Sequence, residues 1–508
     1  MFKSNRDADS ILSQSNFQGK IIAMNTVSVL NRASNARDLR IQTSTWIPRN
    51  ILAVFAITLA LAVSSWAVGK EKVLYTFQGT GDGVEPIGGV VRDAKGNLYG
   101  TTRFNFQSSG APTGFGLVYQ LTPTQRGEFK EKVLHVFQGE VVDGQSPQSS
   151  VVFDAAGNLY GTADGGLFGC GIVYKLAPTP NGPWTETIIH QFNAFNGHND
   201  GCEPIGSLIF DKAGNLYGTT SQGGGGTTDT FCTNGCGTVF KLVPNKDDSW
   251  TESILHALHR GGGGSPDGQN PFDSVVFDNA GNLYGTTLAG GPDDLGTVFK
   301  LTPATSGKWT KTLLFKFHDL VNNPPDGANP AAGVVLDPSG NLYGTTTGGG
   351  GALGGGGTVF KLTSGANGKF KESVIHRFSL SESGFQDGML PQGGLIMDSA
   401  GNLFGTTFLG GAHNEPLCQV AGQQVFVGCG TIFKLTPTSD GKWKESFLHA
   451  FQGDTDGGFP EPDHLTMDAV GNLYGTASAG GKLVQSQNGG FNSFGVVFEI
   501  LGAGASAR

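Results

Sequence analysis

The sequence has little that would place the protein in a membrane, on nucleic acid or in a well-marked enzyme family. Its longest apolar run, residues 51–63, is too short to span a bilayer comfortably. Of the 33 basic and 42 acidic side chains, residues 1–68 hold seven and three, so the rest of the chain carries 26 against 39. This acidic balance argues against nucleic acid and anionic lipid as partners. The Gly-x-Ser-x-Gly, His-Glu-x-x-His and phosphate-loop motifs are absent.

Helical patterning is also missing, because no stretch repeats its apolar residues every 3.6 positions. Glycine is abundant instead, at 82 of 508 residues, and it lies beside β-branched and aromatic runs. A core pattern, Gly-Asn-Leu-(Tyr/Phe)-Gly-Thr, occurs seven times at spacings of 57 to 70 residues. Glycines at fixed places indicate turns rather than disorder. The first glycines of the seven copies are Gly96, Gly157, Gly214, Gly281, Gly340, Gly401 and Gly471.

One repeat predicts four short strands. In the second copy these are residues 151–154, 159–162, 171–176 and 184–192, which turn-forming residues separate. A four-stranded antiparallel sheet cannot bury both faces alone, but sheets repeated radially pack against their neighbours. The seven copies therefore predict an all-β fold, a seven-bladed β-propeller of four-stranded antiparallel blades. A linear β-solenoid fits less well, since its repeats are usually shorter.

The ends of the repeat region predict how the ring closes. The first copy of the fourth strand, residues 73–77, precedes every inner strand, and the last third strand, residues 496–500, has no fourth strand after it. We expect the N-terminal strand to complete the last blade, which would remove an exposed sheet edge. The propeller would span residues 69–501, with 502–508 as a disordered tail, and would be a monomer.

Strand direction predicts two unequal faces. The turns between first and second strands and between third and fourth strands share one face, here called the short-turn face. The loops between second and third strands and between blades share the other, the loop-rich face. These loops are long and irregular, as at 102–116, 220–237, 407–430 and 477–495. Binding usually resides in such loops.

Residues 1–68 form an N-terminal extension. Arg49 precedes the apolar run, and Ser64, Ser65 and Ala67 follow it as small residues suited to a cleavage site. We predict a signal peptide and a secreted, periplasmic or cell-surface protein whose mature chain has no transmembrane span. An uncleaved N-terminal anchor is the alternative, and either Met1 or Met24 is the start.

Six cysteines lie in glycine-rich loops on the loop-rich face, which fits an oxidising compartment. Their spacing does not match that of zinc sites. The pairing of Cys202 with Cys236 stays open as an alternative to the expected set. The expected disulfides are Cys418–Cys429, Cys232–Cys236 and Cys170–Cys202.

The repeated motifs resemble those of the GloVer tandem repeats. They combine Gly-Asn-Leu-Tyr-Gly-Thr-Thr, Gly-Thr-Val-Phe-Lys-Leu-Thr-Pro, Ile-Leu-His-x-Phe and Asp-Gly-x-x-Pro over about residues 70–500. The resemblance implies an exported bacterial repeat protein and brings no catalytic residues with it. The anchoring tails of such proteins have no recognisable counterpart here, which leaves surface attachment open.

Seven Asp-Gly pairs precede the first strands, each with a proline three residues after the glycine. Gathered at the channel mouth, their carboxylates would offer oxygen ligands to a cation such as calcium. The alternative, which we favour, is that the aspartate caps a turn while the glycine takes a positive φ. These residues are Asp82, Asp143, Asp200, Asp267, Asp326, Asp387 and Asp456. A second set ends the first strands and is expected to be structural: Asp93, Asp154, Asp211, Asp278, Asp337, Asp398 and Asp468.

Two further positions recur in the fourth strand. A catalytic histidine should occur once beside particular partners, so a repeated one indicates packing or a repeated hydrogen bond. Repeated aromatic side chains at the strand start could form a belt for sugars, but blade-edge packing is favoured. The histidines are His135, His190, His256, His376 and His449, replaced by Tyr75 and Phe315 in two copies. The aromatic residues are Trp184, Trp250, Trp309 and Trp443, with Phe129 and Phe370.

Residues that break the repeat are better enzyme candidates, because catalysis needs one site. They are His198, His259, His318, His413, His464, Glu85, Glu203 and Glu461. Two functional hypotheses follow. The first is a scaffold that binds carbohydrate or a surface partner through its loop-rich face. The second is an extracellular polysaccharide lyase or glycoside hydrolase with its site at the channel mouth.

Overall fold

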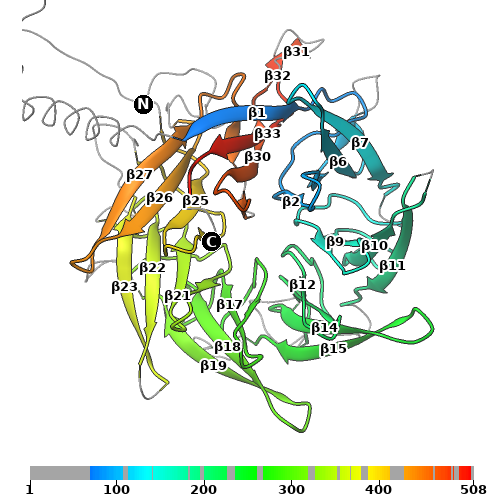
Figure 1. Ribbon diagram of the computed structural model, residues 1–508. Helices are drawn as coiled ribbons and strands as arrows, with labels where there is room; N and C mark the ends of the chain where they lie inside the picture. Colours follow the sequence, from blue (N-terminus) through cyan, green and yellow to red (C-terminus); the bar gives the residue numbers. More distant parts are fainter. Residues whose placement is uncertain are drawn as a thin grey trace, which may run out of the picture. The chain divides into compact units, whose positions relative to one another are not determined.

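Seven antiparallel sheets, six with four strands and one with five, form a closed ring of blades (Figure 1). They belong to one unit of the chain, Trp66–Arg508. The predicted signal segment within 1–68 lies outside the described residues. The computed structural model describes residues 69–106, 112–139, 141–180, 183–194, 200–225, 235–259, 267–318, 326–351, 355–365, 368–378, 387–411, 428–460, 464–481, 484–485 and 491–504.

The first six blades use their strands in chain order from the channel outward, and the last blade takes β1 as its outer strand. The inner strands are β2 (Val91–Arg92), β8 (Val152–Phe153), β12 (Ile209–Phe210), β16 (Val276–Phe277), β20 (Val335–Leu336), β24 (Ile396–Met397) and β29 (Thr466–Met467). The second strands are β3 (Leu98–Thr102), β9 (Leu159–Ala163), β13 (Leu216–Thr220), β17 (Leu283–Thr287), β21 (Leu342–Thr346), β25 (Leu403–Thr407) and β30 (Leu473–Ala479).

The outer half of each blade is longer. The third strands are β6 (Leu117–Pro123), β10 (Ile172–Ala177), β14 (Thr238–Pro244), β18 (Thr297–Pro303), β22 (Thr358–Ser364), β26 (Thr431–Pro437) and β33 (Val496–Leu501). The fourth strands are β7 (Phe129–Val136), β11 (Thr185–Gln191), β15 (Trp250–Ala257), β19 (Trp309–Lys316), β23 (Phe370–Arg377), β27 (Trp443–Ala450) and β1 (Lys70–Thr76). Loops add β4 (Asn105–Phe106), β5 (Pro112–Gly114), β28 (Gly458–Pro460), β31 (Val484–Gln485) and β32 (Phe491–Asn492).

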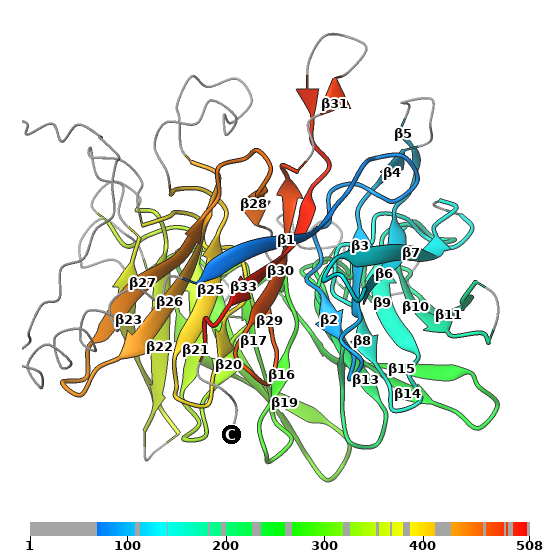
Figure 2. The same ribbon diagram turned by 45° about the horizontal axis from the view of Figure 1, so that its top comes forward.

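The N-terminal strand closes the ring, as predicted. Strand β1 pairs antiparallel with β33, so that Lys70 lies opposite Leu501 and Thr76 opposite Val496. Figure 2 shows β1 lying along β33 and β30. The last blade is thus built from both ends of the repeat region. Because β1 pairs with β33, the outer edge of β33 is not left without a neighbouring strand.

The hydrophobic core lies between neighbouring blades. One cluster joins Tyr99 and Val118 of the first blade to Val151, Leu159 and Tyr174 of the second. Similar clusters occur at the other boundaries. No blade covers both of its faces alone, so closure of the ring completes the burial.

The glycine inside the repeated motif makes room for this core. A Cβ on Gly161 would lie 2.4 Å from the Tyr174 hydroxyl, and one on Gly218 would lie 2.6 Å from Cζ of Phe240. The second strand therefore needs glycine where an aromatic ring of the third strand crosses it. This explains why the motif repeats without being a site.

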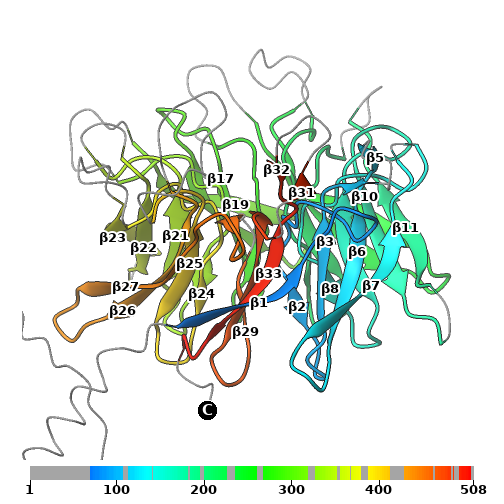
Figure 3. The same cartoon turned by 90° about the horizontal axis from the view of Figure 1, so that it is seen from above.

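The two faces differ as the strand order predicts. Figure 3 shows β5, β31 and β32 among the loops on one side of the ring and the hairpin turns on the other. Past β33, Gly502 to Gly504 turn back, and the Gly504 amide donates to the Gly471 carbonyl at 2.9 Å. Within the described residues, no helix has the length and apolarity needed to cross a bilayer.

Candidate functional site

The aspartates of the short-turn face hold the first turn of each blade. Asp154 accepts the backbone N–H groups of Ala156 and Asn158 at 2.9 Å, the Asn158 side-chain amide at 2.6 Å and the Tyr160 hydroxyl at 3.1 Å. Partial burial opposes ionisation, but these hydrogen bonds outweigh it and lower the pKa of Asp154. A carboxylate with all of its acceptor positions used is a structural group.

The Asp-Gly aspartates lie on the loop-rich face, one at each blade boundary. Asp143 accepts the Gln138 backbone N–H at 2.6 Å and lies 3.1 Å from Nε2 of His135. Asp82 likewise accepts the Gln78 backbone N–H and the Tyr75 hydroxyl. The carboxylates of four more of these aspartates also accept a backbone N–H: Asp200, Asp267, Asp326 and Asp456.

The residues after these aspartates bend the chain sharply. The glycine takes a positive φ in all seven turns, as expected, from 85° at Gly268 to 128° at Gly201. The residue two positions later is also left-handed, which the sequence did not predict; Glu203 has φ 57°. Its backbone N–H donates to the Cys170 carbonyl of the preceding blade at 2.8 Å. This hydrogen bond recurs at every boundary and ties neighbouring blades together.

Sequence reasoning missed a glutamate that faces each of these turns from the next blade. Glu186, for example, lies on β11 four residues before His190. The pairing of β11 with β10 shifts register between the two residues, and they face opposite boundaries of the blade. Oε1 of Glu186 lies 3.9 Å from Nε2 of His135. A sequence signal existed, because six of the seven fourth strands carry glutamate here. They are Glu71, Glu131, Glu186, Glu252, Glu372 and Glu445, with Lys311 in the seventh.

The repeated tryptophans pack between blades. Trp250 of the third blade meets Tyr160 of the second edge to face, with ring centroids 5.9 Å apart. Trp184, Trp309 and Trp443 make the same contact with Tyr99, Tyr217 and Tyr343. The blade-edge interpretation therefore describes these rings.

The central channel is narrow. A Cβ on Gly206 would lie 2.6 Å from the carbonyl carbon of Asp273, and one on Gly394 would lie 2.6 Å from the ring of His464. A cavity of about 50 Å³ remains between the inner segments. Ligand pockets are usually ~300 Å³ or more, so the channel interior is too small for a substrate.

One singular pair does lie in this channel. His464 Nε2 is 3.8 Å from Oδ2 of Asp273, which also accepts the Gly333 backbone N–H at 2.7 Å. Asp273 was not singled out from the sequence, although only the last blade, with Asp463, also carries an acid five residues before the aspartate that ends the inner strand. The pair joins two distant blades and lies in a tightly packed place.

The other singular candidates lie apart from one another. The His259 and His318 backbone N–H groups cap Asp267 and Asp326, and Glu85 forms an ion pair with Arg103 at 3.9 Å. His198, His413 and Glu461 lie outside the described residues.

A pocket of about 410 Å³ opens on the loop-rich face between the second and third blades. Gln145, Gln148, Asp164 and Glu203 supply its polar groups. Gln148 donates to Asp164 at 2.9 Å, and Ser221 donates to Glu203 at 2.9 Å. Because Gln148 also borders the channel cavity, the pocket lies beside the channel mouth.

Asp164 has no equivalent in the other blades. It pairs with Gln145 at a bridge where the other blades place Phe104, Gln222, Ala289, Gly348, Leu409 and Ala479. Burial, only partly offset by the Gln148 hydrogen bond, raises the pKa of Asp164 to about 6. An acid with this pKa changes its charge near neutral pH.

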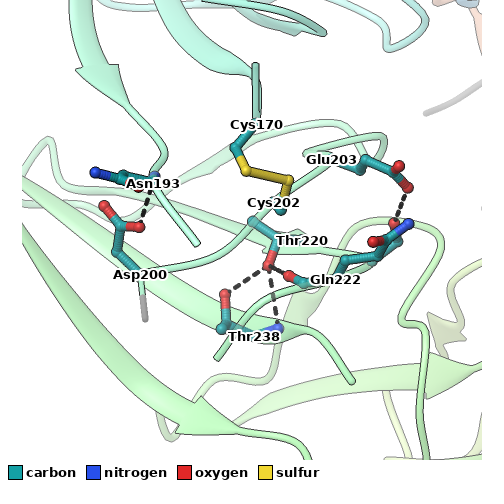
Figure 4. Close-up of a disulfide and its surroundings, with 9 residues drawn as sticks. Cys170, Asn193, Asp200, Cys202, Glu203, Thr220, Gln222 and Thr238 are labelled. Carbon is teal, nitrogen blue, oxygen red and sulfur yellow. Dashed lines mark hydrogen bonds between the residues drawn. A yellow bond between two sulfur atoms is a disulfide. The ribbon is translucent and has the colours of Figure 1, made fainter. Parts of the chain in front are cut away.

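A disulfide forms one wall of this pocket. Cys170 and Cys202 are bonded, which confirms the predicted pair and excludes the Cys202–Cys236 alternative. Figure 4 shows the bond beside Glu203. Cys236 and Cys429 are also disulfide-bonded, while Cys232 and Cys418 lie outside the described residues.

Two exposed apolar residues come directly before a lining segment of this pocket. Leu167 and Phe168 precede its lining residues Gly169 and Cys170 and are 61% and 43% exposed. We call these two residues the rim.

The short-turn face carries two hollows that are larger than the pocket around Asp164. One of about 680 Å³ lies between the second and third blades around Tyr160, Phe210 and Trp250. Another of about 460 Å³ lies between the fifth and sixth blades around Tyr343 and Trp443. Both follow from the repeated tryptophan–tyrosine packing, which leaves open space outside each ring pair.

Comparison with solved structures finds distant matches. An extracellular domain assigned to a hybrid two-component system of B. thetaiotaomicron aligns over 85% of this chain and 41% of its own, at 12% identity and a TM-score of 0.45. An ancestral GH74 enzyme aligns over 84% of this chain and 52% of its own, at 12% identity and a TM-score of 0.47. The chain thus spans about half or less of the length of these proteins. No curated protein matches the chain.

A family model does match most of the sequence. It describes the Gloeobacter/Verrucomicrobia repeat and covers residues 53–231 and 225–482. The two matched segments hold all seven copies of the core motif. The chain therefore belongs to the Gloeobacter/Verrucomicrobia repeat family, the GloVer repeats that its motifs resemble.

Proposed function

We propose that this propeller is an exported carbohydrate-binding protein and that the ligand enters the pocket around Asp164 on the loop-rich face. The observation that carries the proposal is the pocket itself, because it breaks the sevenfold repeat at a bridge position where the other blades have no acid. A repeated scaffold with one irregular, polar pocket is suited to a ligand that binds once.

The chemistry of the pocket suits a sugar. The amides of Gln145 and Gln148 and the carboxyl groups of Asp164 and Glu203 can donate to and accept from hydroxyl groups. Phe168 at the rim offers an aromatic face to the apolar side of a pyranose ring. A volume of about 410 Å³ suits one or two sugar units.

The pocket is also held in place before a ligand arrives. The Cys170–Cys202 bond and the Glu203 N–H to Cys170 carbonyl hydrogen bond both cross the boundary between the two blades that form the walls. Preorganised walls reduce the entropy lost on binding.

Hydrolysis of a polysaccharide is the second candidate. Asp164 has a pKa of about 6 and the negative charge of Glu203 contributes to it. Paired carboxyl groups, one protonated and one ionised, are what glycosidases use. In that case turnover would fall as pH rises through about 6, because the protonated acid is lost.

The test is a panel of oligosaccharides and polysaccharides applied to the purified full chain, with binding and product release both measured. Glu203→Gln should weaken binding by ~10-fold or more, since it removes a charged acceptor. Glu85→Gln is the matched control, because Glu85 occupies the same repeat position in another blade with φ 54°. Binding without product release rejects the hydrolase, and a protein ligand instead of a glycan rejects the carbohydrate proposal.

A further inference from the structure

Three side chains meet at the blade boundaries, and two of these sets are compact. His135, Asp143 and Glu186 form one set, and His190, Asp200 and Glu252 form the other. In each set the three ligand atoms all lie within 4.8 Å of one another. Each set spans two blades, because the glutamate comes from the fourth strand of the following blade.

Several of these atoms are buried without a hydrogen bond. Glu186 Oε1, Glu252 Oε1 and His190 Nε2 all lack a hydrogen-bond partner. Nε2 of His190 lies 3.4 Å from Oδ2 of Asp200. Two carboxyl groups and an imidazole whose ligand atoms lie within 4.8 Å of one another form a compact donor set, and a bound cation would give their unpartnered atoms a partner.

The seventh copy of the glutamate position shows how such a charge can be supplied. Lys311 replaces the glutamate there, and its Nζ lies 3.0 Å from Oδ1 of Asp267. Nε2 of His256 lies 3.0 Å from the other oxygen of Asp267. The lysine side chain is only 5% exposed, so its ammonium group is a buried cation held against the same His–Asp pair.

We propose that the two compact sets, His135–Asp143–Glu186 and His190–Asp200–Glu252, each bind a divalent transition-metal ion, and that the Lys311 ammonium replaces the ion at its own boundary. One imidazole nitrogen and two carboxylate oxygens form a donor set suited to Zn²⁺, with a water molecule as fourth ligand. The ions would join consecutive blades, and this role does not depend on carbohydrate binding.

The experiment measures metal content and thermal unfolding of the full chain loaded with Zn²⁺ and then dialysed. Glu186→Gln and Glu252→Gln should each retain about one Zn²⁺ fewer per chain than the wild type, because each removes one ligand. Chelation should lower the Tm of the wild type more than that of either variant.

Two further variants sharpen the test. Glu131→Gln is the matched control, since Glu131 faces Tyr75 and Asp82 with no imidazole, and it should leave the metal content unchanged. Lys311→Glu should add about one Zn²⁺ by completing a set with His256 and Asp267. Equal metal content in the wild type and the two glutamine variants, with a Tm that responds to pH alone, would overturn the proposal in favour of a shared proton.

Discussion

Asp154 and Asp164 lie ten residues apart in one blade and at opposite ends of its second strand. Asp154 has four hydrogen bonds, a lowered pKa and a counterpart in every blade. Asp164 has one side-chain hydrogen bond, a raised pKa and no acidic counterpart. Asp154 thus has its acceptor positions used within its own turn, whereas Asp164 on the loop-rich face accepts a single side-chain hydrogen bond.

The largest effect should come from the disulfide beside the pocket. Replacing Cys170 and Cys202 together by alanine should lower the free energy of unfolding by about 3.5 kcal/mol, as expected for a bond that closes a segment with a sequence separation of 32. Urea unfolding of the oxidised proteins measures it. A loss below about 1 kcal/mol would mean that the blade boundary does not depend on the bond.

The next effect should come from the short-turn face. Asp154→Ala removes the acceptor of four hydrogen bonds and should cost about 2–3 kcal/mol of stability while leaving ligand affinity unchanged. Asp440→Ala is a suitable control, because this turn acid is 57% exposed and its loss should leave the free energy of unfolding nearly unchanged. A drop in affinity with Asp154→Ala would show that both faces serve the ligand.

The contribution of Asp164 to the free energy of unfolding should change with pH in the opposite direction from that of Asp154. Because folding raises its pKa to about 6, the wild type should lose stability relative to Asp164→Asn as pH rises from about 4 through about 6. At pH 8 the asparagine variant should be more stable by about 2 kcal/mol, and the difference should vanish near pH 4. Unfolding curves across this range test it, and parallel curves would contradict the raised pKa.

The smallest change in stability should come from the rim. Phe168→Ala should alter the free energy of unfolding by less than about 0.5 kcal/mol but weaken glycan binding by ~10-fold. Phe447→Ala, at a phenylalanine of similar exposure in another blade, should change neither. Equal glycan affinities of the two variants would show that Phe168 does not contact the ligand.

Much of the fold could be predicted because the same motif recurs once in every blade. Seven copies of Gly-Asn-Leu-(Tyr/Phe)-Gly-Thr gave the number of blades, and the displaced first strand predicted that β1 pairs with β33. The observed inner strands are shorter than expected, since pairing ends before Asp154 turns the chain. Loop positions favoured the Cys170–Cys202 pair but left Cys202–Cys236 open, and the structure decides for the first.

The site was harder, because its residues meet across blades. Asp164 was overlooked because the second blade has one residue fewer between its core motif and the bridge. Alignment of the motifs assigns the bridge position to Gly165, whereas the structure places Asp164 there. The boundary glutamates are far in sequence from the aspartates that they face: Glu186 and Asp143, for example, are 43 residues apart. They meet only because neighbouring blades pack side by side in the propeller. Such contacts depend on blade spacing, which composition and periodicity do not encode.

The most direct test is titration calorimetry with the tightest-binding oligosaccharide on two variants of the same blade, Asp164→Asn and Asp154→Asn. The account predicts that Asp164→Asn loses ~10-fold or more in affinity while folded and that Asp154→Asn binds as the wild type does. Wild-type affinity in Asp164→Asn, or lost affinity in a folded Asp154→Asn, would contradict the assignment of binding to the loop-rich face.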